Sequence, residues 1–142
     1  MDESSEKHFN GKVAQKAVIM KEGKVLLIRD PREANEIWEL PSGRMNEGEL
    51  PAEGLARELK EELGADFQIG QVVHLEQFFQ HSDQKNALMI AYLVTISDEE
   101  AAFTLAEAEI CKIGWFTPKE ALALTLFPEY RRTLEIYFNQ TN

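Results

Sequence analysis

Three glutamates in the middle of the chain, Glu58, Glu61 and Glu62, have a spacing that could do chemistry. At about 100° per residue, a helix places Glu58 and Glu62 one turn apart and Glu61 beside both. Two carboxylates about 5 Å apart repel by roughly 3 kcal/mol at an effective dielectric of about 20. Uptake of a proton or binding of a divalent cation would remove that repulsion. Oxygen ligands with no His or Cys nearby favour Mg²⁺ or Mn²⁺ over zinc, and a solvated acidic face is the alternative.

The helix that must carry these carboxylates has clear signals at both ends. Pro51 suits the first helical turn, where its missing N–H costs nothing, and Gly64 suits the left-handed exit. Leu50 stands where Ser, Thr or Asp would cap the helix better, at a cost of about 1 kcal/mol. Helical spacing puts the small and apolar side chains on one stripe, which contains Ala52, Leu55, Ala56, Leu59 and Leu63. The helix is therefore expected to pack on its leucines and to present the glutamates on the flank.

The wider stretch from Gly43 to Ala65 resembles the Nudix box, G-x5-E-x7-R-E-U-x-E-E-x-G-U, in which U is aliphatic. Nine specified positions fall in register, namely Gly43, Glu49, Arg57, Glu58, Leu59, Glu61, Glu62, Gly64 and Ala65. The adjacent WELPSG segment and a later Trp-Phe pair also resemble the family. The resemblance implies the Nudix fold, an α/β/α sandwich with a mixed central sheet. It also implies metal-dependent hydrolysis of a nucleoside diphosphate linked to a further group X, by attack of water at a phosphorus.

The resemblance carries roles over to individual glutamates. It implies that Glu58 and Glu62 are metal ligands and that Glu61 is a further ligand or the base that activates water. Arg57 lies four residues from both Glu53 and Glu61, so we expect it to orient carboxylates. The predicted catalytic residues are therefore Glu58, Glu61 and Arg57.

Other positions of the motif and its surroundings have supporting roles. We expect Gly43, Glu49 and Gly64 to be structural, with Glu49 orienting the loop before the helix. The family often has glycine where this chain has Ser42, and the backbone carbonyl of Ser42 could still serve as a metal ligand. The family often recruits an acidic residue from a late loop, and Glu109 is the metal-ligand candidate here, with Glu107 second and a solvated loop as the alternative.

Outside the motif the candidates for substrate binding are weaker. Arg29 ends a predicted strand and could contact phosphate, although a surface pair with an acid is the alternative. Phe79 lies, like Phe78 and His81, where residues that select the substrate tend to lie after the box. The aromatic residues Trp38, Trp115 and Phe116 are expected in the core rather than as platforms for a base.

Hydrophobic periodicity predicts strands at 13–20, 24–29, 37–40, 70–80, 87–96 and 110–116. The first two are joined by a turn at Glu22 and Gly23. The apolar run at 87–96 is typical of a central strand buried on both faces. A capping box at Thr117 opens a short helix to about residue 124, and Pro128 opens the last helix. We expect residues 1–10 to be a flexible N-terminus and 11–142 to form a single domain.

Composition limits the function further. The formal net charge of −10 argues against binding a nucleic acid polymer through its backbone, and it means that an anionic substrate needs cations at its site. No apolar run reaches the length of a membrane span, and the N-terminus lacks the apolar segment of a signal peptide. The single cysteine, Cys111, fits a reducing compartment, and we expect it to be a small buried residue. These features predict a cytoplasmic protein.

The substrate is the least determined part of the sequence interpretation. ADP-ribose hydrolases of the family often show a proline some fifteen residues after the box, where this chain has Phe78, Phe79 and Gln80. The short chain favours a (d)NTP pyrophosphohydrolase that acts on a small molecule as a monomer or homodimer. A pyrophosphatase for ADP-ribose or a nucleotide sugar is the alternative. The alternative of another class is a Nudix domain that binds nucleotides without catalysis.

Overall fold

The computed structural model describes residues 7–33 and 35–141. Part of the predicted flexible N-terminus, residues 1–6, therefore lies outside the described residues, and residues 7–10 belong to no helix or strand. Within the described ranges, no helix is long and apolar enough to cross a membrane.

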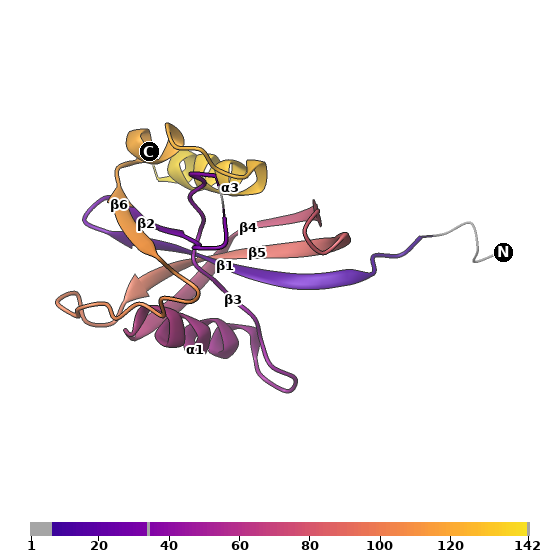
Figure 1. The fold of residues 1–142 in the computed structure, drawn as a ribbon, viewed down its shortest axis with the longest axis horizontal. Coiled ribbons are helices and arrows are strands. Elements are labelled where there is room, and N and C mark those ends of the chain that lie inside the picture. Colours follow the sequence, from indigo (N-terminus) through magenta and orange to yellow (C-terminus); the bar gives the residue numbers. More distant parts are fainter. Residues whose placement is uncertain (1–6, 34, 142) are drawn as a thin grey trace.

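The centre of the molecule is a mixed sheet (Figure 1). Its strands are β1 (Gly11–Lys21), β2 (Lys24–Arg29), β3 (Ser42–Gly43), β4 (Phe67–Gln80), β5 (Lys85–Ile96) and β6 (Lys112–Phe116). They lie in the order β4-β5-β1-β2-β6, with β3 paired to β1. Strand β1 is parallel to β5 and antiparallel to β2 and β3, so the sheet changes direction around β1.

Helices cover both faces of this sheet. Helix α1 (Pro51–Leu63) lies on one face, and α3 (Pro128–Gln140), together with the short α2 (Pro118–Leu122), lies on the other (Figure 1). This arrangement is the predicted α/β/α sandwich. The predicted capping box of α2 is present, because Thr117 and Glu120 bond each other's backbone N–H groups.

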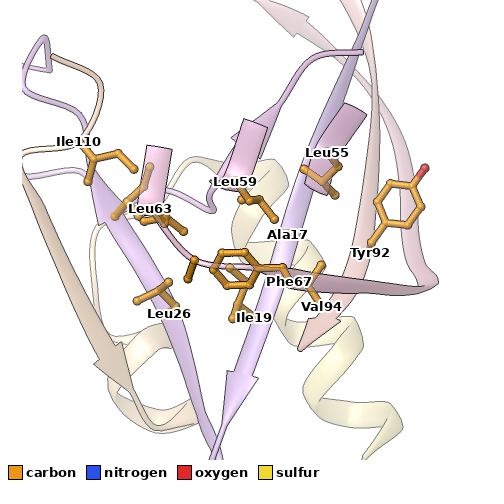
Figure 2. Packing of buried hydrophobic residues seen from close by; sticks show 12 residues of the cluster. Ala17, Ile19, Leu26, Leu55, Leu59, Leu63, Phe67, Tyr92, Val94 and Ile110 are labelled. Carbon is orange, nitrogen blue, oxygen red and sulfur yellow. The ribbon is translucent and has the colours of Figure 1, made fainter. Parts of the chain in front are cut away.

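Alternation along the strands builds a separate apolar core on each face. In β1, Ala17 and Ile19 face α1, whereas Val18 faces α3. Figure 2 shows the α1 core, in which Leu55 and Leu59 pack over the sheet. Strand β5 contributes residues to both cores, as the prediction of a strand buried on both faces requires.

Three expectations about local structure are wrong. Residues 37–40 do not form a strand of the sheet, since only isolated bridges occur there, at Trp38 and Glu39. Cys111 is exposed rather than buried, because it precedes β6 and its thiol faces the carbonyl of Arg29 at 3.5 Å. On α1, Ala52 is exposed and Gly54 is buried, since the first turn of the helix lies beyond the edge of the core and Met45 packs against Gly54.

Candidate active site

One cavity brings together most of the residues singled out in the sequence. It has a volume of about 460 Å³ and lies where β3, the exposed flank of α1 and the loop before β6 meet. Its lining residues are Arg32, Ser42, Gly43, Arg44, Glu58, Glu61, Glu62, Ala106 and Glu109. The three glutamates of α1, the backbone of Ser42 and the late-loop candidate Glu109 therefore share one site.

Gly43 brings β3 close to α1. A Cβ at this position would lie 2.8 Å from Cβ of Glu58 and 3.1 Å from Cδ1 of Leu55, so a larger residue would push the two elements apart. On its other side, β3 pairs with Gln15 and Lys16 of β1, and this pairing fixes it to the sheet. The absence of a side chain on Gly43 therefore sets how closely the Ser42 backbone approaches the glutamates.

The left-handed residue Gly64 ends α1 directly after the glutamates. Its φ of 74° is unfavourable for a residue with a side chain, and its N–H donates to the carbonyl of Lys60 at 2.8 Å. The opposite end of the helix begins at Leu50, which offers no side-chain cap, as expected. These two ends fix which turn of α1 carries the carboxylates.

Arg57 connects the carboxylates of the site. Its guanidinium donates to Glu49 at 2.8 Å, to Glu58 at 3.0 Å and to Glu61 at 3.2 Å, and it also donates to the carbonyl of Arg44 at 3.0 Å. Of its two predicted partners, Glu61 is present, whereas Glu49 takes the place expected for Glu53. The bond from Arg57 lowers the pKa of Glu49, and the N–H of Asn46 adds to the effect. Arg57 thus ties the loop before α1 to the helix.

Glu62 experiences the strongest electrostatic cost. Burial first, and then repulsion from Glu58 and Glu109, raises its pKa to about 7, against an ordinary value of 4.5. Lys16 acts in the opposite direction without cancelling the effect. The carboxylate of Glu62 is thus costly to ionise where no cation lies beside it.

The donor chemistry of this cavity suits a hard divalent cation. Its carboxylates and the carbonyl of Ser42 are oxygen ligands, and a cation would remove the repulsion that raises the pKa of Glu62. Within residues 7–33 and 35–141, no three acidic, His or Cys side chains already surround a single point.

Two arginines of the cavity were not foreseen from the sequence. The guanidinium of Arg32 donates to Asp30 at 2.7 Å and to Glu109 at 3.2 Å, so it places Glu109 at the rim. Arg44 follows Gly43 directly and also lines the cavity. Both belong to polar loops whose sequence has no periodicity. The signals that could have identified them are the position of Arg32 after β2 and the position of Arg44 inside the motif.

Arg29 does not line this cavity. Its guanidinium donates to the carbonyl of Asn35 at 3.1 Å and lies 3.9 Å from the carboxylate of Glu36. It is not among the residues that line the site. Arg29 therefore lies near an acidic side chain, and phosphate contact by Arg29 stays a prediction.

A second cavity of about 750 Å³, called the aromatic cavity below, lies between the loop after β2, strand β4 and the start of α3, and both aromatic and charged residues line it. Phe79 lies in its wall with its side chain 44% exposed, and the ring contacts His81 edge-on at 5.0 Å. Tyr130 contributes another ring, beneath the ammonium of Lys16 at 5.0 Å. Lys16 lines this second cavity, and its backbone pairs with Ser42, which lines the first.

The other aromatic residues pack as predicted. Trp38 and Phe116 meet edge to face at 5.0 Å and pack on the core beside α3, and Trp115 packs on the core beside α1. None of the three is among the residues that line the two cavities described here. Phe79, which is 44% exposed, is therefore better placed for contact with a ligand than these three rings or the buried Tyr130.

Comparison with known proteins places this chain in a family. The sequence matches the NUDIX domain model over residues 12–136. It is 29% identical over 123 residues to the CTP pyrophosphohydrolase of Escherichia coli K12, covering 85% of this chain and 87% of that protein. The solution structure of the E. coli ORF135 protein superposes with a TM-score of 0.76 at 25% identity, covering 92% of this chain and 91% of the other. The MutT protein of Methanosarcina mazei Go1 superposes with a TM-score of 0.78 at 24% identity, covering 96% and 99%. The chain therefore belongs to the Nudix hydrolase family.

Proposed function

We propose that this protein is a pyrophosphohydrolase that converts a (d)NTP and water into a nucleoside monophosphate and pyrophosphate, with Mg²⁺ or Mn²⁺ as its cation. The observation that carries the proposal is the convergence of Glu58, Glu61 and Glu62 with the backbone of Ser42 on one cavity. Nudix hydrolases generally use divalent cations, and the oxygen donors of this cavity match that requirement.

Five residues of the cavity have a proposed role as cation ligand or base. Glu58, Glu62 and the carbonyl of Ser42 would hold the cation, and Glu109 is a weaker candidate ligand from the opposite rim. When bound, a divalent cation supplies charge neutralisation for the diphosphate and lowers the pKa of coordinated water. Glu61, whose side chain is 58% exposed, is the candidate base for the attacking water.

Arg57 and Glu49 would act on these groups without touching the substrate. Their bond at 2.8 Å keeps the guanidinium beside Glu58 and Glu61, so the carboxylates stay on the cavity side of the helix. Such an arrangement would keep the ligands in place as the cation and the substrate exchange.

The aromatic cavity is the proposed site for the nucleoside. Phe79 offers an exposed ring in its wall, and Lys16, which also lines it, pairs through its backbone with Ser42 of the carboxylate cavity. A cytosine nucleotide is the first candidate because the E. coli relative is a CTP pyrophosphohydrolase that aligns over 85% of this chain. We therefore propose CTP or dCTP as the substrates to measure first.

A substrate panel tests the proposal. Purified protein is incubated with CTP, dCTP, dGTP, ADP-ribose and a nucleotide sugar, with Mg²⁺ and with a chelator, and the products are identified. The proposal expects monophosphate and pyrophosphate from a triphosphate, with Mg²⁺ only. A higher kcat/KM for ADP-ribose or the nucleotide sugar would favour the alternative substrate class. Binding of nucleotides without turnover of any of them would favour the non-catalytic alternative.

The setting of this activity is also a proposal. A protein with one cysteine, exposed and free, suits a reducing compartment, and we propose the cytoplasm. The oligomeric state is proposed to be a monomer or a homodimer, which size-exclusion chromatography with light scattering would distinguish.

A further inference from the structure

A third cavity, of about 780 Å³, adjoins the carboxylate site and has the opposite charge. It is lined by Asn10, Gly11, Lys12, Arg44, Asp83 and Lys85. Arg44 also lines the carboxylate cavity, so the two cavities share one residue. We propose that this cationic cavity binds the phosphates of the substrate that lie beyond the hydrolysed linkage, an inference that rests on the proposed function.

The charge of the cavity is unusual for this chain. Three cationic side chains surround a single carboxylate, whereas the whole sequence carries a formal net charge of −10. Asp83 is paired with Lys12, and Arg44 and Lys85 act on the same carboxylate through space. Among the ion pairs of the described residues, none within 4.0 Å involves Arg44 or Lys85. Two positive charges are thus left over for an anion.

The sheet fixes the two lysines relative to each other. Gly11 of β1 pairs with Asn86 of β5 so closely that a Cβ on Gly11 would lie 2.0 Å from the Asn86 carbonyl oxygen. Lys12 and Lys85 are the immediate neighbours of this pair. Only 25% of the Lys12 side chain is exposed, so its position is held by the surrounding chain. Because Lys12 and Lys85 come from adjacent strands, the cationic cavity has a defined geometry.

The two cavities complement each other electrostatically around a polyphosphate. Carboxylates repel every phosphate that is not neutralised by a cation, so the remaining phosphates of a triphosphate need another source of positive charge. The lysines and Arg44 provide it on the side where Arg44 joins the cavities. A sugar in place of the terminal phosphates would leave these cations without a partner. The cationic cavity therefore favours substrates with a polyphosphate tail over nucleotide sugars.

Binding of inorganic tripolyphosphate, measured by calorimetry in metal-free buffer, tests the cavity apart from hydrolysis. The variant Lys12→Ala/Lys85→Ala is expected to bind about tenfold more weakly than the wild type, since each lysine contributes a modest, solvent-screened attraction. Asp83→Asn is expected to bind about threefold more tightly, because it removes the competing carboxylate. A variant that merely damaged the fold would not bind more tightly.

A matched control removes the same charge elsewhere. Lys24 pairs with Lys21 at the far end of β1, and Lys119 lies on α2. The variant Lys24→Ala/Lys119→Ala should bind tripolyphosphate as the wild type does. Equal affinity of the wild type and Lys12→Ala/Lys85→Ala, or no binding by the wild type, would overturn the proposal.

Kinetics then separate this inference from the proposed function. In Lys12→Ala/Lys85→Ala, the ratio of kcat/KM for dCTP to that for dCDP should fall about tenfold, because the two nucleotides differ only in the additional phosphate of dCTP. Turnover of dCTP with no change in that ratio would refute the cationic cavity and leave the pyrophosphohydrolase standing. Lysine-dependent binding of tripolyphosphate without turnover of any nucleotide would refute the pyrophosphohydrolase and leave the anion site standing.

Discussion

Glu62 has a pKa raised to about 7, mainly by burial and then by the neighbouring Glu58 and Glu109. Its folded-state pKa lies above its ordinary value of 4.5, so the neutral carboxyl favours folding. That stability is fully present below the ordinary pKa and is lost as the pH rises through about 7. In the absence of a cation, the folded protein should therefore be less stable in mildly alkaline buffer, because Glu62 is then ionised at a buried position.

Glu62→Gln keeps this position neutral at every pH. In metal-free buffer at about pH 8, the variant should be more stable than the wild type by on the order of 2 kcal/mol, after discounting for the exposed part of the carboxylate. At about pH 5 the two should differ less, because the wild-type carboxyl is then largely protonated. Urea unfolding at both values measures the difference, with Glu53→Gln, an exposed position of the same helix, as control. A wild type as stable as Glu62→Gln at about pH 8 would contradict the assigned environment.

Arg57 is the other residue whose contacts make a sharp prediction. Lysine at this position keeps the charge but loses the planar fork that serves Glu49, Glu58 and Glu61 together. Arg57→Lys should lower kcat by roughly 10–100-fold and raise the Mg²⁺ concentration needed for half-maximal activity, as for other residues that orient ligands. Steady-state kinetics against Mg²⁺ measures both effects, and Lys60→Ala on the exposed face of α1 serves as control. An unchanged Mg²⁺ dependence in Arg57→Lys would show that the guanidinium does not position the ligands.

The sequence identified the glutamates and Arg57, but not the other basic residues around the site. Glu58, Glu61 and Glu62 lie on a single helix, so spacing alone predicts that they are neighbours. By contrast, Arg32 reaches Glu109 across 77 positions in the chain, and Lys12 meets Asp83 across 71. Contacts of this kind depend on the strand order, which hydrophobic periodicity does not specify.

At the scale of the elements, the close contact between β3 and α1 determines the geometry of the site. Gly43→Ala would put a Cβ 2.8 Å from Cβ of Glu58, which must move β3 or α1. We expect a loss of stability of about 1–3 kcal/mol, as for other overpacked positions, together with a lower kcat. Urea unfolding and steady-state kinetics measure the two effects. The neighbouring Ser42→Ala, which adds no bulk, should lose less stability. If Gly43→Ala were as stable as the wild type, the close approach of β3 to α1 would not contribute to stability.

The elements were predicted unequally well. Helix α1 was defined by Pro51 and Gly64, and its end at Leu63 agrees with that prediction, because proline and a left-handed glycine act locally. The segment 37–40 was predicted as a strand from its apolar residues, but its backbone instead forms isolated bridges to β2 and to Leu126. The conformation of such a segment depends on the residues that pack around it, and these cannot be read from the sequence of the segment itself.

At the level of the whole chain, the layers were predicted and the charge distribution was not. The Nudix resemblance implied a sandwich with a mixed sheet, and the structure has α1 on one face of that sheet and α3 on the other (Figure 1). The net charge of −10 indicated only that an anionic substrate would need cations. The fold gathers acidic residues around one cavity and basic residues around another, and Arg44 lines both cavities.

Pyrophosphate release from dCTP, followed over a titration with Mg²⁺, tests directly whether the α1 carboxylates hold a catalytic cation. The wild type should have no turnover in chelator and should saturate with Mg²⁺. Glu62→Gln should lose on the order of 10²-fold or more in kcat while its circular dichroism spectrum stays native. Glu53→Gln should behave as the wild type, because Glu53 lies outside the cavity. Near-normal kcat in Glu62→Gln, or equal wild-type turnover with chelator and with Mg²⁺, would contradict this account.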